Sequence, residues 1–304
     1  MTEKQPTSVQ PSAVTLQSIA QDLLTLLDRK ALLELRAKID SLLGLSVEPP
    51  VTKSTLHSSE EAIVEFPEPE HLAWLQKGVV TWNDWREQNR EIVPDLQGAN
   101  LSGLNLAFVN FAGVNLKRAN LSGADMRGAF LNEANLKEAN LYMADLIGVN
   151  CQQACLEAAN LQGADIYKAN FSHANLQEAN LIQASIRRAT LVGANLHRAK
   201  LKQADLLQAN LVQTDLSHAD LQQANMEGTN LIEANLEQAN LLGANLNRAN
   251  LCRAKLYKAN IHHAKINGVT LKGAVMPDGT VHGGGSELGS WESGVGKIQI
   301  SNEK

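Results

Sequence analysis

The chain has 304 residues and a formal net charge of −5, and hydrophobic residues reach 44% of the sequence while aromatic residues reach only 4%. An apolar content made mainly of Leu and Ala favours a core of small and medium side chains repeated along an axis over a globule built around large central aromatics. The mildly negative charge predicts no general affinity for nucleic acid or anionic membranes. No apolar stretch approaches the ~18 residues that indicate a membrane span.

The N-terminal residues and the cysteines give an expectation about location. Residues 1–6 lack the basic start and the apolar run of a secretory signal. The three cysteines, Cys151, Cys155 and Cys252, are odd in number and lack metal-ligand spacing, which favours a reducing compartment. We therefore expect a cytoplasmic protein that binds no metal and no cofactor.

Residues 15–43 are predicted to form a helical hairpin, after a disordered N-terminus at residues 1–14. Two apolar stripes at helical spacing mark the two helices. The stripes consist of Leu16, Ile19, Leu23 and Leu26, and of Leu32, Leu35, Ile39 and Leu42. Because each buried Leu is worth about 1.5–3 kcal/mol over leaving it in water, we expect the second stripe to act as an oligomerisation helix, through weak homodimerisation or docking of a foreign partner.

Residues 44–69 are expected to be a linker, because four prolines interrupt a stretch rich in Ser and Glu. Residues 70–94 then carry another helical stripe. Its apolar members are Leu72, Leu75, Val79, Trp82 and Trp85. The stripe ends shortly before Pro94, where a periodic region begins, so we expect this segment to be a capping helix for that region.

From Leu96 to Met276 every fifth residue is Leu, Ile, Met, Phe or Cys, over 37 successive positions without slippage. We name the five positions of each pentad after their usual occupants. The Leu position is preceded by an Asn/Asp position and, one residue earlier, by a small position that is usually Ala. Two variable positions, mostly polar or Gly, follow the Leu position. Ala119-Asn120-Leu121-Ser122-Gly123 is one such pentad.

A period of five fits neither an α-helix nor a flat strand. In a helix, five residues advance about 500°, so successive Leu side chains would spread around the axis. In a strand, an odd spacing would place them on opposite faces. If the chain turns by a quarter circle after each pentad, however, every small and every Leu position points inward. Asn, Asp and Gly tolerate the backbone angles that we expect at such corners.

These pentads resemble the pentapeptide-repeat family. The runs Ala119-Asn120-Leu121 and Ala134-Asn135-Leu136 carry the resemblance, which implies a mainly β fold: a right-handed quadrilateral β-helix over residues 95–276, here with about nine coils and with α-helical segments before it. The segment from Trp82 to Arg86 resembles the entry helix of many cyanobacterial members. The departures from Asn/Asp leave both inward positions untouched. They are Phe130, Cys155, Ser185, Thr190, Lys200, Lys255, Lys265, Thr270 and Val275.

Residues 277–304 are expected to form a flexible tail, because turn residues break the pattern after Met276 and a glycine run follows. No nucleophile, base and orienting group share a motif in the chain, and the adjacent His262 and His263 lack a third metal ligand. An enzyme is therefore not expected.

Stacking the pentads by twenty residues arranges the outward positions in columns. An apolar column at the first variable position consists of Val192, Val212, Ile232 and Cys252, and it is a candidate contact surface. Chance, or packing on the chain's own N-terminal helices, is the alternative interpretation. An acidic column at the Asn/Asp position consists of Asp125, Asp145, Asp165 and Asp205. The basic residues nearby favour a solvated, locally neutralised face.

Two function classes remain after the enzyme is set aside. The first is a non-catalytic structural or protein-interaction scaffold with a protein partner. The second follows from the resemblance, since some bacterial family members mimic duplex DNA and act on DNA gyrase. From Asp95 to Val275, 16 Lys/Arg face 14 Asp/Glu, and this near-neutral balance argues against a DNA mimic. The scaffold is the preferred hypothesis.

Overall fold

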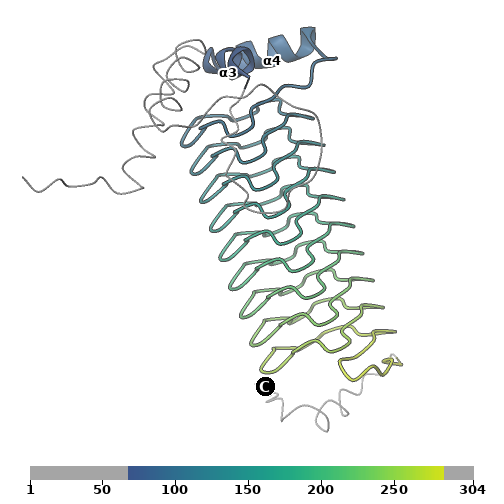
Figure 1. The fold of residues 1–304 in the computed structure, drawn as a ribbon. Helices are drawn as coiled ribbons and strands as arrows, with labels where there is room; N and C mark the ends of the chain where they lie inside the picture. Colours follow the sequence, from purple (N-terminus) through teal and green to yellow (C-terminus); the bar gives the residue numbers. More distant parts are fainter. Residues whose placement is uncertain (1–67, 284–304) are drawn as a thin grey trace, which may run out of the picture. The chain divides into compact units, whose positions relative to one another are not determined.

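The computed structural model describes residues 68–283. Two helices, α3 (Pro69–Gln76) and α4 (Val79–Gln88), lie at the end where the stacked coils begin (Figure 1). The sequence predicted one continuous helical segment here, whereas the structure divides it at Gly78, whose φ of 104° only glycine adopts readily. No described helix has the length and hydrophobicity needed to cross a bilayer.

Main-chain pairing recurs at a spacing of twenty residues throughout the periodic region. Parallel β-bridges run from Asp95↔Asn115 to Lys255↔Val275, always between residues at the Asn/Asp position. Four pentads therefore complete one coil, and successive coils stack along one axis (Figure 1). Within residues 68–283 the β structure consists of these isolated bridges rather than of longer strands.

Three hydrogen bonds join each pentad to its neighbours in the adjacent coils. Leu121 N–H donates to the carbonyl of Asn140 (2.7 Å), Gly123 N–H to that of Tyr142 (2.8 Å), and Asn140 N–H to that of Ala119 (2.9 Å). The side chains add a second ladder, because Asn140 Nδ2 donates to Asn120 Oδ1 at 3.1 Å. Neighbouring coils thus satisfy each other's main-chain groups, as the strands of a sheet do.

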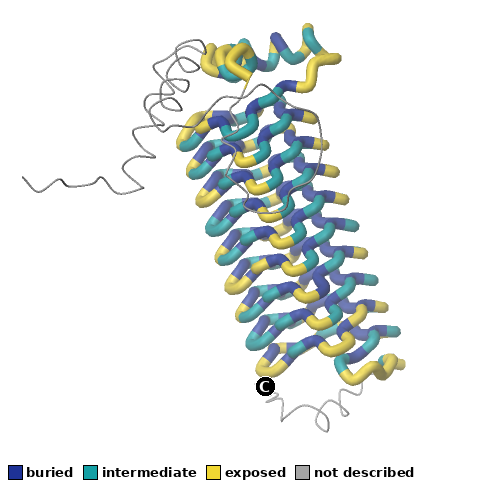
Figure 2. Tube along the Cα trace, viewed as in Figure 1, coloured by how far each residue is buried: buried dark blue, intermediate teal, exposed yellow. Residues whose placement is uncertain are grey.

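The inward positions form the core. Leu121 and Ala119 are both 0% exposed, and buried residues follow the inside of each coil in Figure 2. Threonines at two small positions satisfy their hydroxyls internally, as in the 2.7 Å bond from Thr214 Oγ1 to the Leu191 carbonyl. Leu104 is 45% exposed at a small position of the first coil, because the site fits Ala and this side of the coil has no coil before it.

The corners lie at the end of each pentad, where the quarter turn was expected, but they accept Gln, Glu, Arg and His as well as Gly. The left-handed backbone occurs at the second variable position, as at Gly123 (φ 63°), and not at the Asn/Asp position. A main-chain bond from the small residue back to the Leu residue closes each corner, as from Ala124 N–H to the Leu121 carbonyl at 3.1 Å. This geometry is that of a type II turn. The Asn/Asp side chain supports it differently, since Asn120 Oδ1 accepts from Ser122 N–H at 3.2 Å.

Side chains of α4 take the place of a preceding coil on one side of the first coil. Trp82 Nε1 donates to the carbonyl of Asn110 (2.8 Å) and Arg86 Nη2 donates to that of Ala112 (2.7 Å). Asn83 Oδ1 accepts from Asn110 N–H at 2.8 Å. In later coils, main-chain groups make these three contacts. The Trp82 ring also packs edge-on against Phe111, with centroids 5.6 Å apart.

The chain folds back at the other end. Val281 pairs with Val275 in an antiparallel bridge, and Gly273 N–H donates to the His282 carbonyl at 2.8 Å. Asp278 Oδ1 accepts from Thr280 N–H at 2.9 Å and fixes the turn between them. Residues 277–283 therefore pack on the last coil, and residues 284–304 of the expected flexible tail lie outside the described residues.

Candidate functional site

The structure brings the four members of the apolar column together on one side of the solenoid. Val192, Val212, Ile232 and Cys252 stand at successive twenty-residue steps, and all four are half-buried because each shields its neighbours. The same column is polar nearer the N-terminus, where Asn132, Gln152 and Ser172 occupy it. The outward apolar surface is therefore local to this part of the column.

A buried polar atom lies beside the apolar column. Asn210 Oδ1 has no hydrogen-bond partner within residues 68–283, whereas Asn250 Oδ1, two coils further on, accepts from Cys252 N–H at 3.1 Å. An unsatisfied buried acceptor costs about 1–3 kcal/mol. The polar groups beside the apolar column thus have fewer hydrogen-bond partners around Val212 than around Cys252.

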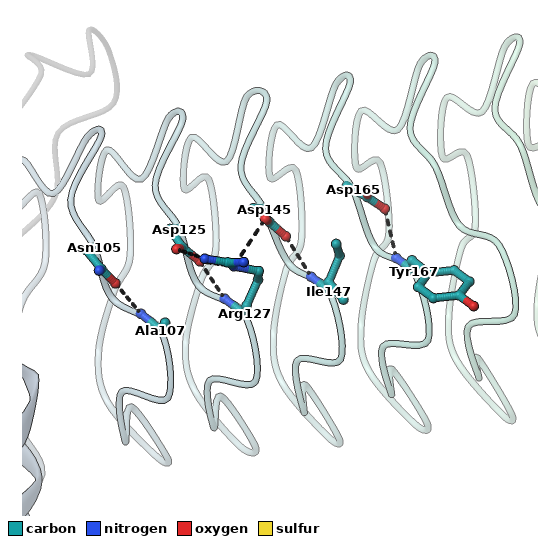
Figure 3. Close-up of polar contacts among 8 residues, drawn as sticks. All are labelled: Asn105, Ala107, Asp125, Arg127, Asp145, Ile147, Asp165 and Tyr167. Atoms are coloured by element: carbon teal, nitrogen blue, oxygen red, sulfur yellow. Dashed lines mark hydrogen bonds and ion pairs between the residues drawn. The ribbon is translucent and has the colours of Figure 1, made fainter.

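Figure 3 shows Asp125, Asp145 and Asp165 of the acidic column with their hydrogen-bond donors. Asp125 Oδ1, Asp145 Oδ1 and Asp165 Oδ1 each accept from the N–H two residues later, at 3.1–3.2 Å. Arg127 lies between the first two carboxylates, with Nη2 2.6 Å from Asp125 Oδ2 and Nε 3.5 Å from Asp145 Oδ2. The carboxylates of this column therefore stabilise the turns of successive coils, and arginine neutralises part of their charge.

The electrostatics of this column agree with that geometry. The hydrogen bond from the Arg127 side chain is the main cause that lowers the pKa of Asp125 below its usual range. The same hydrogen bond raises the pKa of Arg127. Further along, Arg187 Nε lies 3.6 Å from Asp205 Oδ2. These pairs are exposed to solvent, so their contribution to stability is small.

A histidine–serine pair was not expected from the sequence. His197 Nδ1 lies 2.8 Å from Ser217 Oγ, and the rings of His197 and His218 meet edge-on with centroids 5.3 Å apart. Asp215 Oδ1 accepts from Ser217 N–H rather than from the imidazole, so the arrangement lacks the orienting group of a catalytic triad. The twenty-residue spacing of His197 and Ser217 was the only signal in the sequence.

The remaining candidate groups do not form a chemical centre in the described residues. Cys151 is buried at a Leu position, and burial raises the pKa of its thiol, so it behaves as a small apolar side chain. Within residues 68–283 no three His, Cys, Asp or Glu side chains are placed to hold a metal ion. The predicted oligomerisation residues Leu32, Leu35, Ile39 and Leu42 lie outside the described residues.

The comparisons with known proteins agree with the pentad geometry. Eight copies of the profile described as "Pentapeptide repeats" match the chain, and together they span residues 95–273. The chain belongs to the pentapeptide repeat family. The right-handed β-helix solenoid of this family is therefore its fold, as the resemblance implied. Among curated proteins, no relative matches the chain.

Several solved pentapeptide-repeat structures resemble the chain. HetL, involved in heterocyst differentiation regulation in the cyanobacterium Nostoc sp. strain PCC 7120, is 32% identical, with 60% of this chain and 93% of HetL covered at a TM-score of 0.39. Rfr23 from the cyanobacterium Cyanothece 51142 is 44% identical over 28% of this chain and 57% of its own, at a TM-score of 0.27. QnrB1, a plasmid-mediated fluoroquinolone resistance protein, is 17% identical over 57% and 86%, at a TM-score of 0.30.

Proposed function

We propose that this pentapeptide-repeat protein is a non-catalytic scaffold that presents a rigid solenoid surface to a protein partner in the cytoplasm. One observation carries the proposal. The inward positions are mostly apolar, so the repeats differ from one another mainly in their outward side chains. These side chains stand in columns, and the main-chain pairing between coils fixes their spacing. Such a surface suits recognition, because its side chains are preorganised and binding orders few additional groups.

The apolar column is the contact surface that we favour on this scaffold. Val192, Val212, Ile232 and Cys252 form a row of adjacent half-buried apolar side chains on one outward column, and such patches are typical of protein contact sites. A partner that covered the row would also exclude water around it, as the periphery of an interface does.

A DNA-mimic function is disfavoured by the same surface. Of the outward columns, the acidic column most resembles the row of negative charges along a DNA backbone. Arg127 and Arg187, however, pair with its carboxylates. The repeats from Asp95 to Val275 carry 16 Lys/Arg against 14 Asp/Glu. A protein that imitates DNA needs a surplus of negative charge along one face.

The proposal is tested by partner capture from a lysate of the source organism, with the full-length chain as bait. Val212→Glu places a charge in the apolar column, and Gln152→Glu places the same charge in the polar part of the same column. We expect a partner that the wild type and Gln152→Glu retain and that Val212→Glu loses, with unchanged circular dichroism for both variants.

Two other outcomes are informative. If Val212→Glu retains the same partner, then the apolar column is not the contact surface, although the scaffold function stands. If the wild-type chain captures no protein beyond those that the heat-unfolded chain captures, the scaffold function itself is contradicted.

A further inference from the structure

The last coil leaves main-chain donors unpaired on two of its sides. In the preceding coil, Leu241 N–H donates to the carbonyl of Asn260 and Gly243 N–H donates to that of His262. The corresponding N–H groups in the last coil have no acceptor within residues 68–283. They belong to Ile261, His263, Ile266 and Gly268. We name residues 261–268 the terminal edge.

Residues 277–282 pair with the other two sides of the coil, where Leu271 N–H also lacks an acceptor within residues 68–283. Lys258 N–H donates to the Pro277 carbonyl at 2.9 Å, and Gly273 N–H donates to the His282 carbonyl at 2.8 Å. The C-terminal residues therefore satisfy the coil around Lys258 and Gly273 and leave the terminal edge uncovered by described residues.

The apolar interior is also less well covered at the terminal edge. Ile261 and Ile266 are 4% and 8% exposed, whereas Leu241 and Leu246, one coil earlier at the same positions, are 0% and 1% exposed. The edge thus combines unpaired donors with buried isoleucines that are slightly more exposed than their counterparts one coil earlier. A β-edge of this kind invites pairing with another extended chain.

Positive charge collects around this edge. Between Gln238 and Pro277 the chain has six Lys/Arg and no Asp/Glu. Arg248 and Arg253 reach back toward glutamates of earlier coils, at 3.9 Å and 3.2 Å. Lys258, Lys265 and Lys272 are exposed and form no ion pair with a described residue. The charges of these three lysines are therefore not neutralised by ion pairs within residues 68–283.

We propose that the terminal edge binds an extended acidic segment of a partner protein, which pairs with the last coil as one further β segment. This inference rests on the proposed scaffold function and adds a site and a partner chemistry to it. The donors of Ile261 and His263 are two residues apart, as along a strand edge, so consecutive outward carbonyls of an extended chain can accept from them. The carbonyls of Ala259 and Ala264 supply matching acceptors, since the carbonyl of Ala239 accepts from Asn260 N–H in the preceding coil.

The main-chain donors decide between an acidic polypeptide and a nucleic acid. Lysine side chains would attract either polyanion. A ladder of alternating N–H and C=O groups matches the groups of a polypeptide backbone, whereas phosphates offer acceptors only. The occupant that the edge favours is therefore a polypeptide whose carboxylates lie near Lys265 and Lys272.

The test uses the full-length protein and fluorescence anisotropy at physiological salt, with three labelled probes. The first is a peptide of alternating Glu and Val, the second a peptide of alternating Glu and Pro with the same charge, and the third a single-stranded DNA oligonucleotide. We expect the Glu-Val peptide to bind at least about tenfold more tightly than the Glu-Pro peptide, which cannot pair as a strand.

Two charge-reversal variants locate the site. Lys265→Glu combined with Lys272→Glu should weaken the Glu-Val peptide at least about tenfold. Lys200→Glu combined with Lys202→Glu makes the same change of charge at exposed residues in the middle of the solenoid and should leave binding unchanged. Equal binding of the two peptides, tighter binding of the oligonucleotide, or equal weakening by both variants would overturn the proposal.

Failure of this inference can be told apart from failure of the scaffold function. If the Glu-Val peptide does not bind while partner capture by the wild-type chain succeeds and survives Lys265→Glu with Lys272→Glu, the terminal edge is not the site and the scaffold remains. If neither the peptide nor any partner binds, both are contradicted.

Discussion

His173 lies against Gly193 in the next coil so closely that a Cβ at residue 193 would come within 2.6 Å of His173 Nδ1. Gly193 also occupies the left-handed corner position, with a φ of 64°. The two requirements can be separated, because Gly148 has a φ of 65° with no atom within 4 Å of the place its Cβ would take. Outward residues of neighbouring coils are thus in van der Waals contact, in addition to the main-chain hydrogen bonds between the coils.

Gly193→Ala should destabilise the solenoid more than Gly148→Ala does. The left-handed backbone alone costs roughly 1–2 kcal/mol with a side chain, and forcing the exposed His173 ring off its rotamer should add about 0.5–1.5 kcal/mol. The double variant His173→Ala with Gly193→Ala should return to the level of Gly148→Ala. Urea denaturation measures all three free energies of unfolding, and equal values for the two single variants would contradict the contact.

Stability should depend on the inward ladder rather than on the outward columns. Leu176 is 1% exposed and Leu196 is 0% exposed, so truncating either to Ala should cost about 2–5 kcal/mol. Gln177→Ala, at the neighbouring first variable position, should cost less than ~0.5 kcal/mol. Thermal melts followed by circular dichroism compare the variants. Similar melting temperatures for the Leu and Gln variants would show that the inward assignment is wrong.

Trp82→Phe should loosen the first coil. The substitution keeps an aromatic ring against Phe111 but removes the donor to the Asn110 carbonyl, which should cost about 1–3 kcal/mol. Trp85→Phe is the matched control, since Trp85 lies on the same helix with no described partner for its indole N–H. Hydrogen exchange should show faster opening of the first coil in Trp82→Phe than in Trp85→Phe, and equal exchange would contradict this role of the indole.

The Asp125–Arg127 pair should make the solenoid slightly less stable at acidic pH. Arg127 lowers the pKa of Asp125 in the folded state, so the stabilisation is complete above the unfolded pKa. It is lost as the pH falls through the lower folded value. Arg127→Gln should raise the pKa of Asp125, measured by NMR titration, whereas Lys168→Gln should leave it unchanged. An unchanged pKa in Arg127→Gln would show that the pair does not persist in solution.

The predicted hairpin at residues 15–43 has its own test in the full-length chain. If its second stripe mediates dimerisation, Leu35→Glu combined with Leu42→Glu should lower the apparent mass in sedimentation without changing the β signal in circular dichroism. A wild-type chain that sediments as a monomer at all concentrations would exclude self-association and leave a foreign partner as the role of the stripe.

The inward half of the structure was predictable from the sequence, and the corner chemistry was not. Leu121 and Ala119 are inward because a five-residue period with an apolar pair two residues apart has one packing solution. Turn propensity named Asn, Asp and Gly as the residues that tolerate the corner angles. At the second variable position, however, residues such as Gln183 and Gln203 also hold a positive φ. Their side chains hydrogen-bond along the column, at 3.2 Å, and this contact between coils is invisible to local propensity.

The contacts that the helices make with the first coil could not be predicted from the sequence either. The helical stripe identified Trp82 as a core residue, but periodicity could not show that Asn83 and Arg86 bond to the first coil's backbone. Those bonds depend on how α4 lies against the first coil, which helical periodicity does not contain. The basic residues around Lys265 can be read from the sequence, whereas the unpaired donors beside them follow from which sides of the last coil residues 277–282 pair with.

The twenty-residue pairing gives the chain two different responses to changes in length. Removal of twenty residues would delete one turn and leave every downstream residue on its original side. Insertion of a single pentad would keep every inward position apolar, yet it would shift everything after it by a quarter turn. Asp205 would then leave the side that Asp145 and Asp165 occupy, and the apolar column would move with it. Relatives that differ by single pentads can therefore share a core while presenting differently ordered surfaces.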